Sequence, residues 1–426
     1  MKRINRPWAW VPTLYFAEGL PYVIVMTVSV IMYKRLGVSN ADIAFYTAWL
    51  YLPWVIKPLW SPIVDIIGTK RRWILSMQAL LAAGFAAVAF SIPGAAFFSM
   101  SLAAFWFVAF LSATHDIAAD GFYMLGLDEG EQSLFVGIRT LFYRLALIAG
   151  QGGMVVLAGW LETGSGVSRA WAWCFTILST AFAMLAAYHW RVLPFPRRDT
   201  AEPTRLLNVV REFATTFVSF FRKPHVAAAL LFMLLYRFPE AMLIKLIAPF
   251  LLDSGANGGL ALTTTQVGLA YGTVGAIGLM LGGIIGGIAA SRGGLKKWLM
   301  PMAWSMSLTC LTFVYLSAGD GHSLPAVCAC VFIEQFGYGF GGTAYTLYLI
   351  FYSRGERATA HYAMATGVMA LGMMVPGMFA GALQESIGYT WFFIFTVGAC
   401  CVTILTASLV KVPASFGRKR TATADK

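Results

Sequence analysis

The sequence predicts an all-α membrane protein with 12 transmembrane helices in two six-helix halves. Hydrophobic residues make up 59% of the 426 residues, charged residues only 12%, and the mean hydropathy is +0.71. A soluble protein would have about 25% charged residues. The apolar residues also form runs of about 20, the length that an α-helix needs to cross the hydrocarbon core of a bilayer.

These runs define the expected spans. The first run is too long for the core of a signal peptide and lacks a small-residue cleavage site, so we expect it to remain in the protein. Hydropathy places the twelve spans at residues 9–32, 43–66, 73–93, 97–118, 134–158, 170–190, 225–252, 266–290, 297–317, 324–350, 361–383 and 388–411.

The placement of basic residues predicts the orientation. With the N-terminus inside, the inner loops hold 23 of the 31 Lys and Arg residues and the outer loops hold three. Positive residues gather on the cytoplasmic side of membrane proteins, so both termini are expected in the cytoplasm. The net charge of +12 therefore reflects topology, and we expect no nucleic-acid partner.

A long polar segment divides the chain. We expect an N-terminal six-helix bundle (1–190), a cytoplasmic linker (191–224), a C-terminal six-helix bundle (225–412) and a cytoplasmic tail (413–426). Within the linker, TRLLNVVREFATTFVSFF has apolar residues at helical spacing with charges opposite them. This pattern favours a helix that lies along the inner membrane surface.

The two halves look like copies of one another. DIIGTKRRWI (65–74) follows the second span, and ASRGGLKKWL (290–299) follows the eighth. Parallel six-span repeats characterise the major facilitator superfamily of transporters. The alignment pairs Gly68 with Gly293, Arg71 and Arg72 with Lys296 and Lys297, and Trp73 with Trp298.

The stretch SPIVDIIGTKRRW (61–73) resembles the signature of that superfamily between spans two and three, although the first glycine of the signature is missing. The resemblance implies a gating role for Asp65, Gly68, Arg71 and Arg72, in which the acid caps a neighbouring helix and the basic pair steadies the inner gate. From the residues themselves, Gly68 allows a tight turn. Simple anchoring of the loop at the inner headgroups is the alternative.

Nine charged residues fall within or at the ends of the predicted spans. A charge at the bilayer centre costs about 2.5–3.5 kcal/mol, so these side chains should point into the bundle, form pairs or line a watery cavity. Both a functional role and static pairing remain open. The residues are Glu18, Lys57, Asp116, Arg139, Arg144, Arg237, Glu240, Lys245 and Glu334.

Helical geometry suggests how some of these charges are arranged. Arg237 and Glu240 are three residues apart and can pair on one face, whereas Lys245 should face elsewhere. Pro239 should bend the seventh span. In the first span, Tyr15, Glu18 and Tyr22 share a face. The two spans occupy matching places in the halves, which favours a shared cavity that binds a polar solute.

Two further patterns concern protons. Asp116 and Asp120 are four residues apart in the fourth span, and two such carboxylates would tend to hold a proton. The alternative for both is pairing with Arg139 or Arg144. In the tenth span Glu334 shares a face with Tyr338, and an isolated glutamate there could carry a proton.

Three other patterns are weak evidence for function. GYGFGGTAYT (337–346) lies within a span and is not expected to bind a nucleotide. Glycines at 278, 282 and 286 indicate close helix packing. The six cysteines all lie in spans without a metal-ligand spacing, so we expect no metal, disulfide or cofactor.

Several motifs resemble the AmpG-type muropeptide permeases: YFAEGLPY, KPLWSPIVD, SATHDIAADGFYM, YRFPEAM and the stretch from ERATAHYAMATG to GYTWFF. The resemblance covers almost the whole chain. It implies a permease of the bacterial inner membrane that imports anhydro-muropeptides, driven by protons. His115 stands where Gln is commoner, so identical coupling does not follow.

The resemblance and the intramembrane charges give a set of candidate roles. Cations and aromatic residues would bind the carboxylates and sugars of a muropeptide, and acids would titrate during transport. We expect a monomer. The substrate-binding candidates are Tyr15, Glu18, Tyr22, Lys57, Arg139, Arg144, Arg237, Lys245 and Tyr338; the proton-coupling candidates are Glu18, Asp116, Glu240 and Glu334.

Other functions fit the sequence less well. A membrane enzyme would need longer outer loops with polar candidates, and a sensor would need a soluble effector domain. The serious alternative is a facilitator-type transporter of another polar or anionic solute, such as a sugar, a drug or an acyl-coenzyme A.

Overall fold

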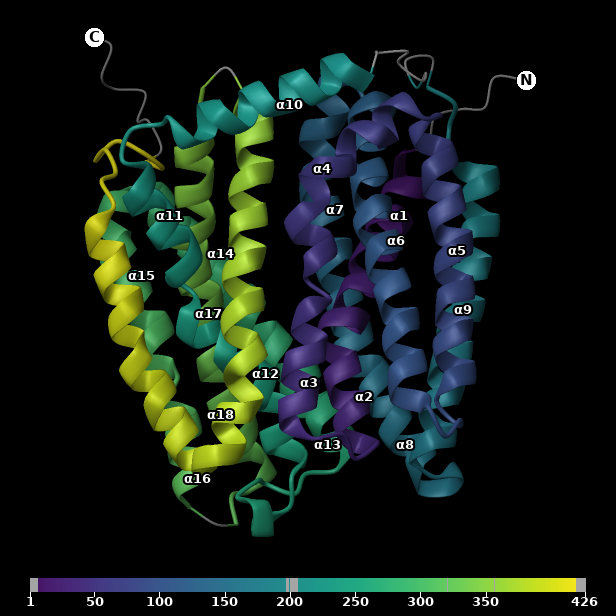
Figure 1. The fold of residues 1–426 in the computed structure, drawn as a ribbon, viewed down its shortest axis with the longest axis vertical. Helices are drawn as coiled ribbons and strands as arrows, with labels where there is room; N and C mark the ends of the chain where they lie inside the picture. Colours follow the sequence, from purple (N-terminus) through teal and green to yellow (C-terminus); the bar gives the residue numbers. More distant parts are fainter. Residues whose placement is uncertain (1–6, 197–198, 200–205, 320, 356, 419–426) are drawn as a thin grey trace. The chain divides into compact units, whose positions relative to one another are not determined.

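The computed structural model describes residues 7–196, 199, 206–319, 321–355 and 357–418. Every regular element within these residues is helical (Figure 1). Within the described residues, ten helical stretches, some of which join two or more of these elements, are long and apolar enough to cross a membrane. The all-helical membrane class predicted from hydropathy is therefore confirmed.

The chain forms two compact units. Unit 1 comprises Met1–Ser39, Trp49–Val210 and Thr263–Gly272. Within it α5 packs against α6 and α9, and α1 packs against α7. Its helices are α1 (Pro7–Val23), α2 (Ser29–Arg35), α4 (Leu52–Ile66), α5 (Lys70–Ser91), α6 (Phe97–Gly126), α7 (Glu129–Ile148), α8 (Val155–Ser165), α9 (Val167–Val192) and α13 (Thr264–Val267).

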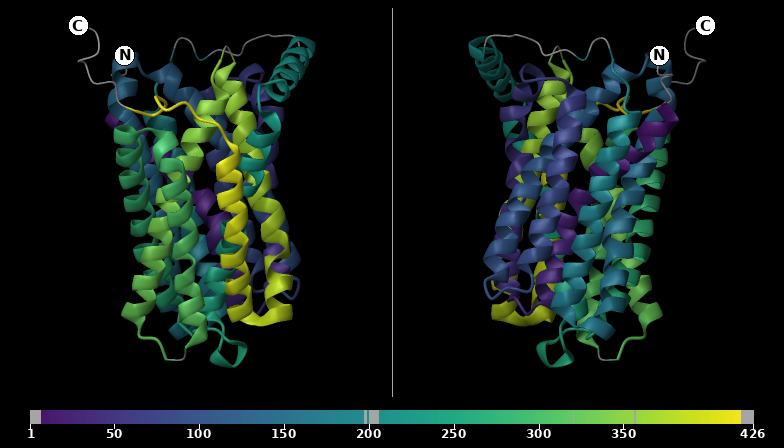
Figure 2. Two further views of the ribbon diagram at one scale, coloured as in Figure 1. Left: turned by 90° about the vertical axis from the view of Figure 1, so that its left-hand side faces the viewer. Right: turned by 90° about the vertical axis from the view of Figure 1, so that its right-hand side faces the viewer.

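Unit 2 comprises Asn40–Ala48, Arg211–Leu262 and Thr273–Lys426. Figure 2 shows its long helices running alongside one another, with α10 at the end where α18 begins. Its helices are α3 (Asn40–Trp49), most of α10 (Leu206–Phe221), α11 (Val226–Leu235), α12 (Phe238–Leu252), α14 (Ala276–Gly293), α15 (Leu295–Thr309), α16 (Leu311–Ala318), α17 (Leu324–Ser353) and α18 (Ala358–Leu409).

Each unit has an aromatic core of its own. In unit 1, the rings of Trp10 and Phe122 meet edge to face with centroids 5.2 Å apart. In unit 2, the ring of Phe232 lies 4.5 Å from that of Tyr348 and 4.6 Å from that of Tyr236. Aromatic pairs of this kind add about 0.5–1.5 kcal/mol beyond the area they bury.

Two short segments at matching places of the repeat belong to a different unit from the residues before and after them. Residues 40–48, in α3, belong to unit 2, and residues 263–272, which include α13, belong to unit 1. In unit 2, a Cβ on Gly381 would lie 2.0 Å from the carbonyl oxygen of Asn40 at the start of α3. In unit 1, a Cβ on Gly159 would lie 2.4 Å from the amide nitrogen of Thr265 in α13. Each segment is thus seated against a helix where only glycine leaves room for the backbone.

Several predicted spans do not correspond to one helix each. The spans at 43–66, 225–252 and 297–317 are each divided between two helices, and the spans at 361–383 and 388–411 lie together in α18. Gly388 interrupts α18 with φ 78° and ψ 168°, a conformation that favours glycine. The number of twelve spans stays a prediction.

The glycine repeat in the eighth span packs as predicted. Gly278, Gly282 and Gly286 lie on α14 and face the backbone of α17, where a Cβ on Gly282 would meet the carbonyl oxygen of Phe336 at 2.1 Å. The stretch 337–346 is part of α17 and is a continuous helix. It therefore has no loop that could surround a phosphate.

The loop repeat needs one correction. Gly68 has φ 83° and forms the turn that the sequence predicts. In the second half the residue with this backbone conformation is Gly294, with φ 81°. The predicted counterpart, Gly293, is still the last residue of α14. The helices that follow keep the predicted alignment, since Trp73 and Trp298 are each the fourth residue of their helix.

Candidate functional site

A group of charged side chains lies between α4, α6 and α7 of unit 1. Lys57 of α4 pairs with Asp116 of α6, and Arg139 of α7 pairs with Asp120 of α6 at 3.1 Å. The side chains of Lys57 and Asp116 are 29% and 21% exposed, and those of Arg139 and Asp120 are 27% and 40% exposed. The four groups are neutralised in pairs yet remain accessible to a solute.

Two residues of α1 are buried against this group. Tyr15 donates its hydroxyl hydrogen to Asp120 Oδ1 at 3.1 Å, and the guanidinium of Arg139 lies 4.5 Å from the centre of its ring. Glu18 is 7% exposed and lies within electrostatic range of Asp116, Asp120 and Lys57. Its Oε2 has no hydrogen-bond partner among the described residues. The sequence prediction that Tyr15 and Glu18 share a polar face is supported by these contacts.

The other two candidates of unit 1 are Tyr22 and Arg144. Tyr22 packs edge to face on Trp54, with ring centroids 5.3 Å apart. Arg144 is half-buried and forms no hydrogen bond or ion pair with another described residue. Of the two arginines considered as partners for the acids of the fourth span, the structure therefore pairs Arg139, and Lys57 supplies the second cation.

A chain of buried polar side chains supports the charged group and was not predicted. Gln78 of α5 lies 2.8 Å from His189 Nδ1 of α9 and 2.9 Å from His115 Nε2 of α6, and His189 Nε2 lies 2.9 Å from the hydroxyl of Thr13 of α1. Thr13 lies five residues before Glu18 on α1, and His115 directly precedes Asp116. The chain therefore fixes α1 and α6, which hold these two acids.

In unit 2 the seventh span is broken rather than bent. Helix α11 ends at Leu235 and α12 begins at Phe238, so Arg237 lies in the break with φ −102° and ψ 15°. Pro239 is in the first turn of α12, where proline is tolerated. The prediction of a bend at Pro239 is corrected accordingly.

The expected pairing of Arg237 with Glu240 is also wrong. Arg237 donates to the hydroxyl of Tyr338 on α17, and its guanidinium lies 4.9 Å from the centre of that ring. Helical i,i+3 spacing did not apply, because Arg237 lies outside the helix that holds Glu240. Both carboxylate oxygens of Glu240 are buried and have no hydrogen-bond partner among the described residues.

Two further buried charges of unit 2 have polar neighbours. Glu334 Oε2 accepts a hydrogen bond from Gln335 at 2.8 Å, while its Oε1 has no hydrogen-bond partner among the described residues. Lys245 donates to Thr47 Oγ1 of α3 at 2.9 Å. Lys245 thus faces away from Glu240, as its spacing predicts.

Of the gating candidates, Arg71 is buried and contacts the backbone of a neighbouring helix. Arg71 is 8% exposed and donates to the carbonyl oxygens of Trp190 and Leu193 at the end of α9. It therefore holds the end of a helix. Arg72 is exposed, and the side chain of Asp65 lies outside the described residues. A gating role for these residues stays a prediction.

Two polar clusters were missed because their members are far apart in the sequence. In unit 1, Glu162 accepts from Arg35, Trp171 and Thr264 at 2.9, 3.0 and 2.7 Å. In unit 2, the amide of Asn40 lies 2.7–3.3 Å from Gln384, Tyr389 and Asp253. The first cluster holds α13 in unit 1, and the second holds α3 in unit 2. The only sign of these clusters in the sequence is an asparagine or a threonine at the start of a helix. Such a residue does not indicate which distant side chain it contacts.

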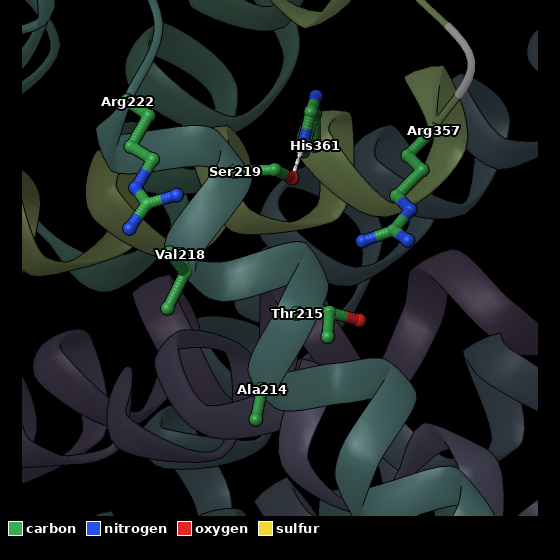
Figure 3. A pocket seen from close by; sticks show the side chains of 7 residues that line it. All are labelled: Ala214, Thr215, Val218, Ser219, Arg222, Arg357 and His361. Carbon is green, nitrogen blue, oxygen red and sulfur yellow. Dashed lines mark hydrogen bonds between the residues drawn. The ribbon is translucent and has the colours of Figure 1, made fainter.

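Two cavities of about 700 Å³ lie away from the charged groups. One is in unit 1, where α5 and α9 line it. The other is in unit 2, between α10 and the start of α18 (Figure 3). Neither is lined by a residue that the sequence proposes for substrate binding or proton coupling.

Comparison with known proteins gives a consistent assignment. A model of the BT1 family matches residues 17–284. The putative transporter AmpG 4 of Rickettsia conorii (strain ATCC VR-613 / Malish 7) is 25% identical over 400 residues, which cover 90% of this chain and 91% of the relative. The anhydromuropeptide permease of Escherichia coli (strain K12) is 27% identical over 399 residues, which cover 91% of this chain and 76% of the relative.

A solved structure shares the fold. The crystal structure of a D-xylose-proton symporter aligns with a TM-score of 0.71 at 13% identity, covering 96% of this chain and 98% of that chain. At this level of identity the likeness establishes the architecture alone. The fold expected from the internal repeat is therefore that of known transporters.

Proposed function

Because this chain belongs to the BT1 family, we propose that it is a secondary active transporter that imports anhydro-muropeptides across the bacterial cytoplasmic membrane, driven by protons. One observation carries the proposal. Each unit holds a group of charges in its predicted spans that contains a buried carboxyl group, Glu18 in unit 1 and Glu240 in unit 2, with an oxygen that has no hydrogen-bond partner among the described residues. A charged group inside the membrane costs free energy, and such groups usually mark binding or coupling sites.

The proposal includes the topology that the charge distribution favours. Twelve spans in two six-helix halves would place both termini in the cytoplasm, with residues 191–224 as the linker between the halves. The repeat and the two compact units support this division. We propose that the protein acts as a monomer, without a metal or cofactor, and by alternating access of a polar site.

Substrate recognition would use the paired charges. A muropeptide offers carboxylates, amides and sugar hydroxyls. Arginine binds carboxylates through two parallel hydrogen bonds, so Arg139 and Arg237 are suited to the peptide stem, and Tyr15 and Tyr338 beside them can contact sugar faces. Lys57 and Lys245 would add positive charge. Arg144 is the weaker candidate, because it forms no hydrogen bond or ion pair with another described residue.

Proton coupling would use the buried acids. In unit 1, Glu18 is buried, and its Oε2 has no hydrogen-bond partner among the described residues. In unit 2, Glu240 and Glu334 both have oxygens without a hydrogen-bond partner in the described part of the chain. We propose that these acids take up and release protons as the substrate binds and leaves.

The test is uptake of a labelled anhydro-muropeptide into proteoliposomes, with and without an inward proton gradient. We expect the gradient to stimulate uptake. Uptake that ignores the gradient would keep the substrate and remove the proton role. An absence of uptake by folded protein would contradict the substrate, and competition binding with sugars, drugs and acyl-coenzyme A would then identify the class of solute.

A further inference from the structure

The cavity of unit 2 at the start of α18 has no part in the proposed transport. Its volume is about 720 Å³, within the range of about 300–1,000 Å³ that is usual for ligand sites. The lining side chains come from α10, the residue that follows it, and the first residues around the start of α18 (Figure 3). They are Ala214, Thr215, Val218, Ser219, Arg222, Arg357 and His361.

The floor of this cavity is fixed by hydrogen bonds. Ser219 donates its hydroxyl hydrogen to the carbonyl oxygen of Thr216 at 2.7 Å, so it accepts from Nε2 of His361 at 2.8 Å. The neighbouring Phe220 is fully buried, and its ring lies 5.6 Å from that of Tyr352. Helix α10 is therefore anchored to unit 2 at this point.

Two guanidinium groups lie on opposite sides of the cavity (Figure 3). Neither Arg222 nor Arg357 forms an ion pair with another described residue, and Arg357 contacts only the hydroxyl of Thr216, at 3.4 Å. Lys223 is already engaged, because it donates to the carbonyl oxygens of Tyr352 and Arg354. None of the described lining residues is acidic. The cavity thus offers two cations and no described acidic residue, a charge that favours an anionic group.

An exposed apolar surface adjoins these cations. Phe217, Val218 and Phe221 on α10 are 46%, 45% and 40% exposed, and the two phenylalanine rings lie 4.7 Å apart. A site for a water-soluble anion has no need of such a surface. Apolar residues beside basic ones on one helix are typical of helices at the membrane surface.

The position in the chain agrees with a headgroup site. The cavity adjoins the end of α17 and the start of α18, both of which are long and apolar enough to span a bilayer. Basic pockets at the cytoplasmic ends of membrane helices bind the headgroups of anionic lipids.

We propose that this cavity binds an anionic phospholipid, with the phosphodiester between Arg222 and Arg357 and an acyl chain along Phe217, Val218 and Phe221. The lipid would hold α10 against the membrane. This inference does not depend on the substrate of the transporter.

The test measures lipid binding to the purified full-length protein by native mass spectrometry and by the midpoint of thermal unfolding. Phosphatidylglycerol should bind and raise the midpoint, whereas phosphatidylcholine should not. In Arg222→Gln/Arg357→Gln we expect about tenfold weaker binding of phosphatidylglycerol, which corresponds to about 1.4 kcal/mol. Equal binding by this variant and the wild type would overturn the proposal.

Three controls make the result specific. Arg292→Gln removes an exposed cation in the last turn of α14, also in unit 2, and should leave phosphatidylglycerol binding unchanged. Phe217→Ser/Phe221→Ser should weaken phosphatidylglycerol binding, because the acyl chain loses its contact. If inorganic phosphate displaces phosphatidylglycerol and the phenylalanine variant binds normally, the cavity is a site for a soluble anion and the lipid assignment is wrong.

Discussion

Three buried or half-buried glutamates have very different surroundings in this protein. Glu162 accepts hydrogen bonds from three side chains. Glu240 has no hydrogen-bond partner among the described residues, and Glu334 has one for only one of its oxygens. A buried charge without partners lowers stability. The latter two glutamates therefore have no structural reason to be charged, which agrees with a role in transport.

The same substitution should have opposite effects at these positions. We expect Glu240→Gln and Glu334→Gln to unfold at the same temperature as the wild type or higher. The amide nitrogen of glutamine replaces an oxygen that has no hydrogen-bond partner among the described residues, so no hydrogen bond is lost. Proton-driven uptake should fall at least about tenfold. Glu162→Gln should instead lower the free energy of unfolding by about 1–3 kcal/mol, because its charge-assisted bonds are weakened.

Unfolding in detergent and gradient-driven uptake are measured on the three variants side by side. If Glu240→Gln and Glu334→Gln were clearly less stable than the wild type, their carboxylates would have partners, and the argument from unpartnered oxygens would fail. If both variants transported normally in response to the gradient, the proton role of these residues would be wrong.

At the scale of helices, the polar chain through Gln78 connects α1, α5, α6 and α9. The side chain of Gln78 lies between His115 and His189, which are 1% and 0% exposed. Gln78→Leu would leave both imidazoles without this partner. We expect a loss of about 1–3 kcal/mol in the free energy of unfolding. We also expect weaker substrate binding, because Glu18 and Asp116 lie on two of the connected helices.

A suitable control is Thr176→Val on α9. Thr176 is exposed, and its hydroxyl donates only to the carbonyl oxygen of Ala172 in the same helix. Thermal unfolding of this variant should match that of the wild type. If Gln78→Leu were equally stable, the four helices would be held by apolar packing alone, and the chain would have no positioning role.

The elements were easier to predict than their contacts. A bilayer requires continuous apolar runs, so eleven of the predicted spans, all but the one at 43–66, coincide with the ten helical stretches of the described residues that are long and apolar enough to cross it. The contacts depend on residues distant in the sequence: Lys245 bonds to Thr47, and Arg237 to Tyr338. The predicted pair of Arg237 and Glu240 failed because a break in the backbone precedes α12, and hydropathy carries no signal for that break.

For the whole molecule, the distribution of Lys and Arg predicts which ends of the helices face the cytoplasm. Two exposed positions of unit 2 test this. Asn257 lies in the predicted outer loop after α12, and Arg292 lies near the end of α14 in a predicted inner loop. A cysteine at position 257 should react with a membrane-impermeant maleimide in intact cells, and a cysteine at position 292 should react only after permeabilisation.

The background for this experiment is Cys401→Ser, because Cys401 is the exposed native cysteine among the six. Labelling of the background alone is measured in parallel. The reverse pattern, with position 292 reactive in intact cells, would invert the topology. It would then place the cavity with Arg222 and Arg357 at the outer face, so that the lipid it binds would come from the outer leaflet. The predicted pattern instead agrees with the 23 basic residues of the inner loops against three in the outer ones.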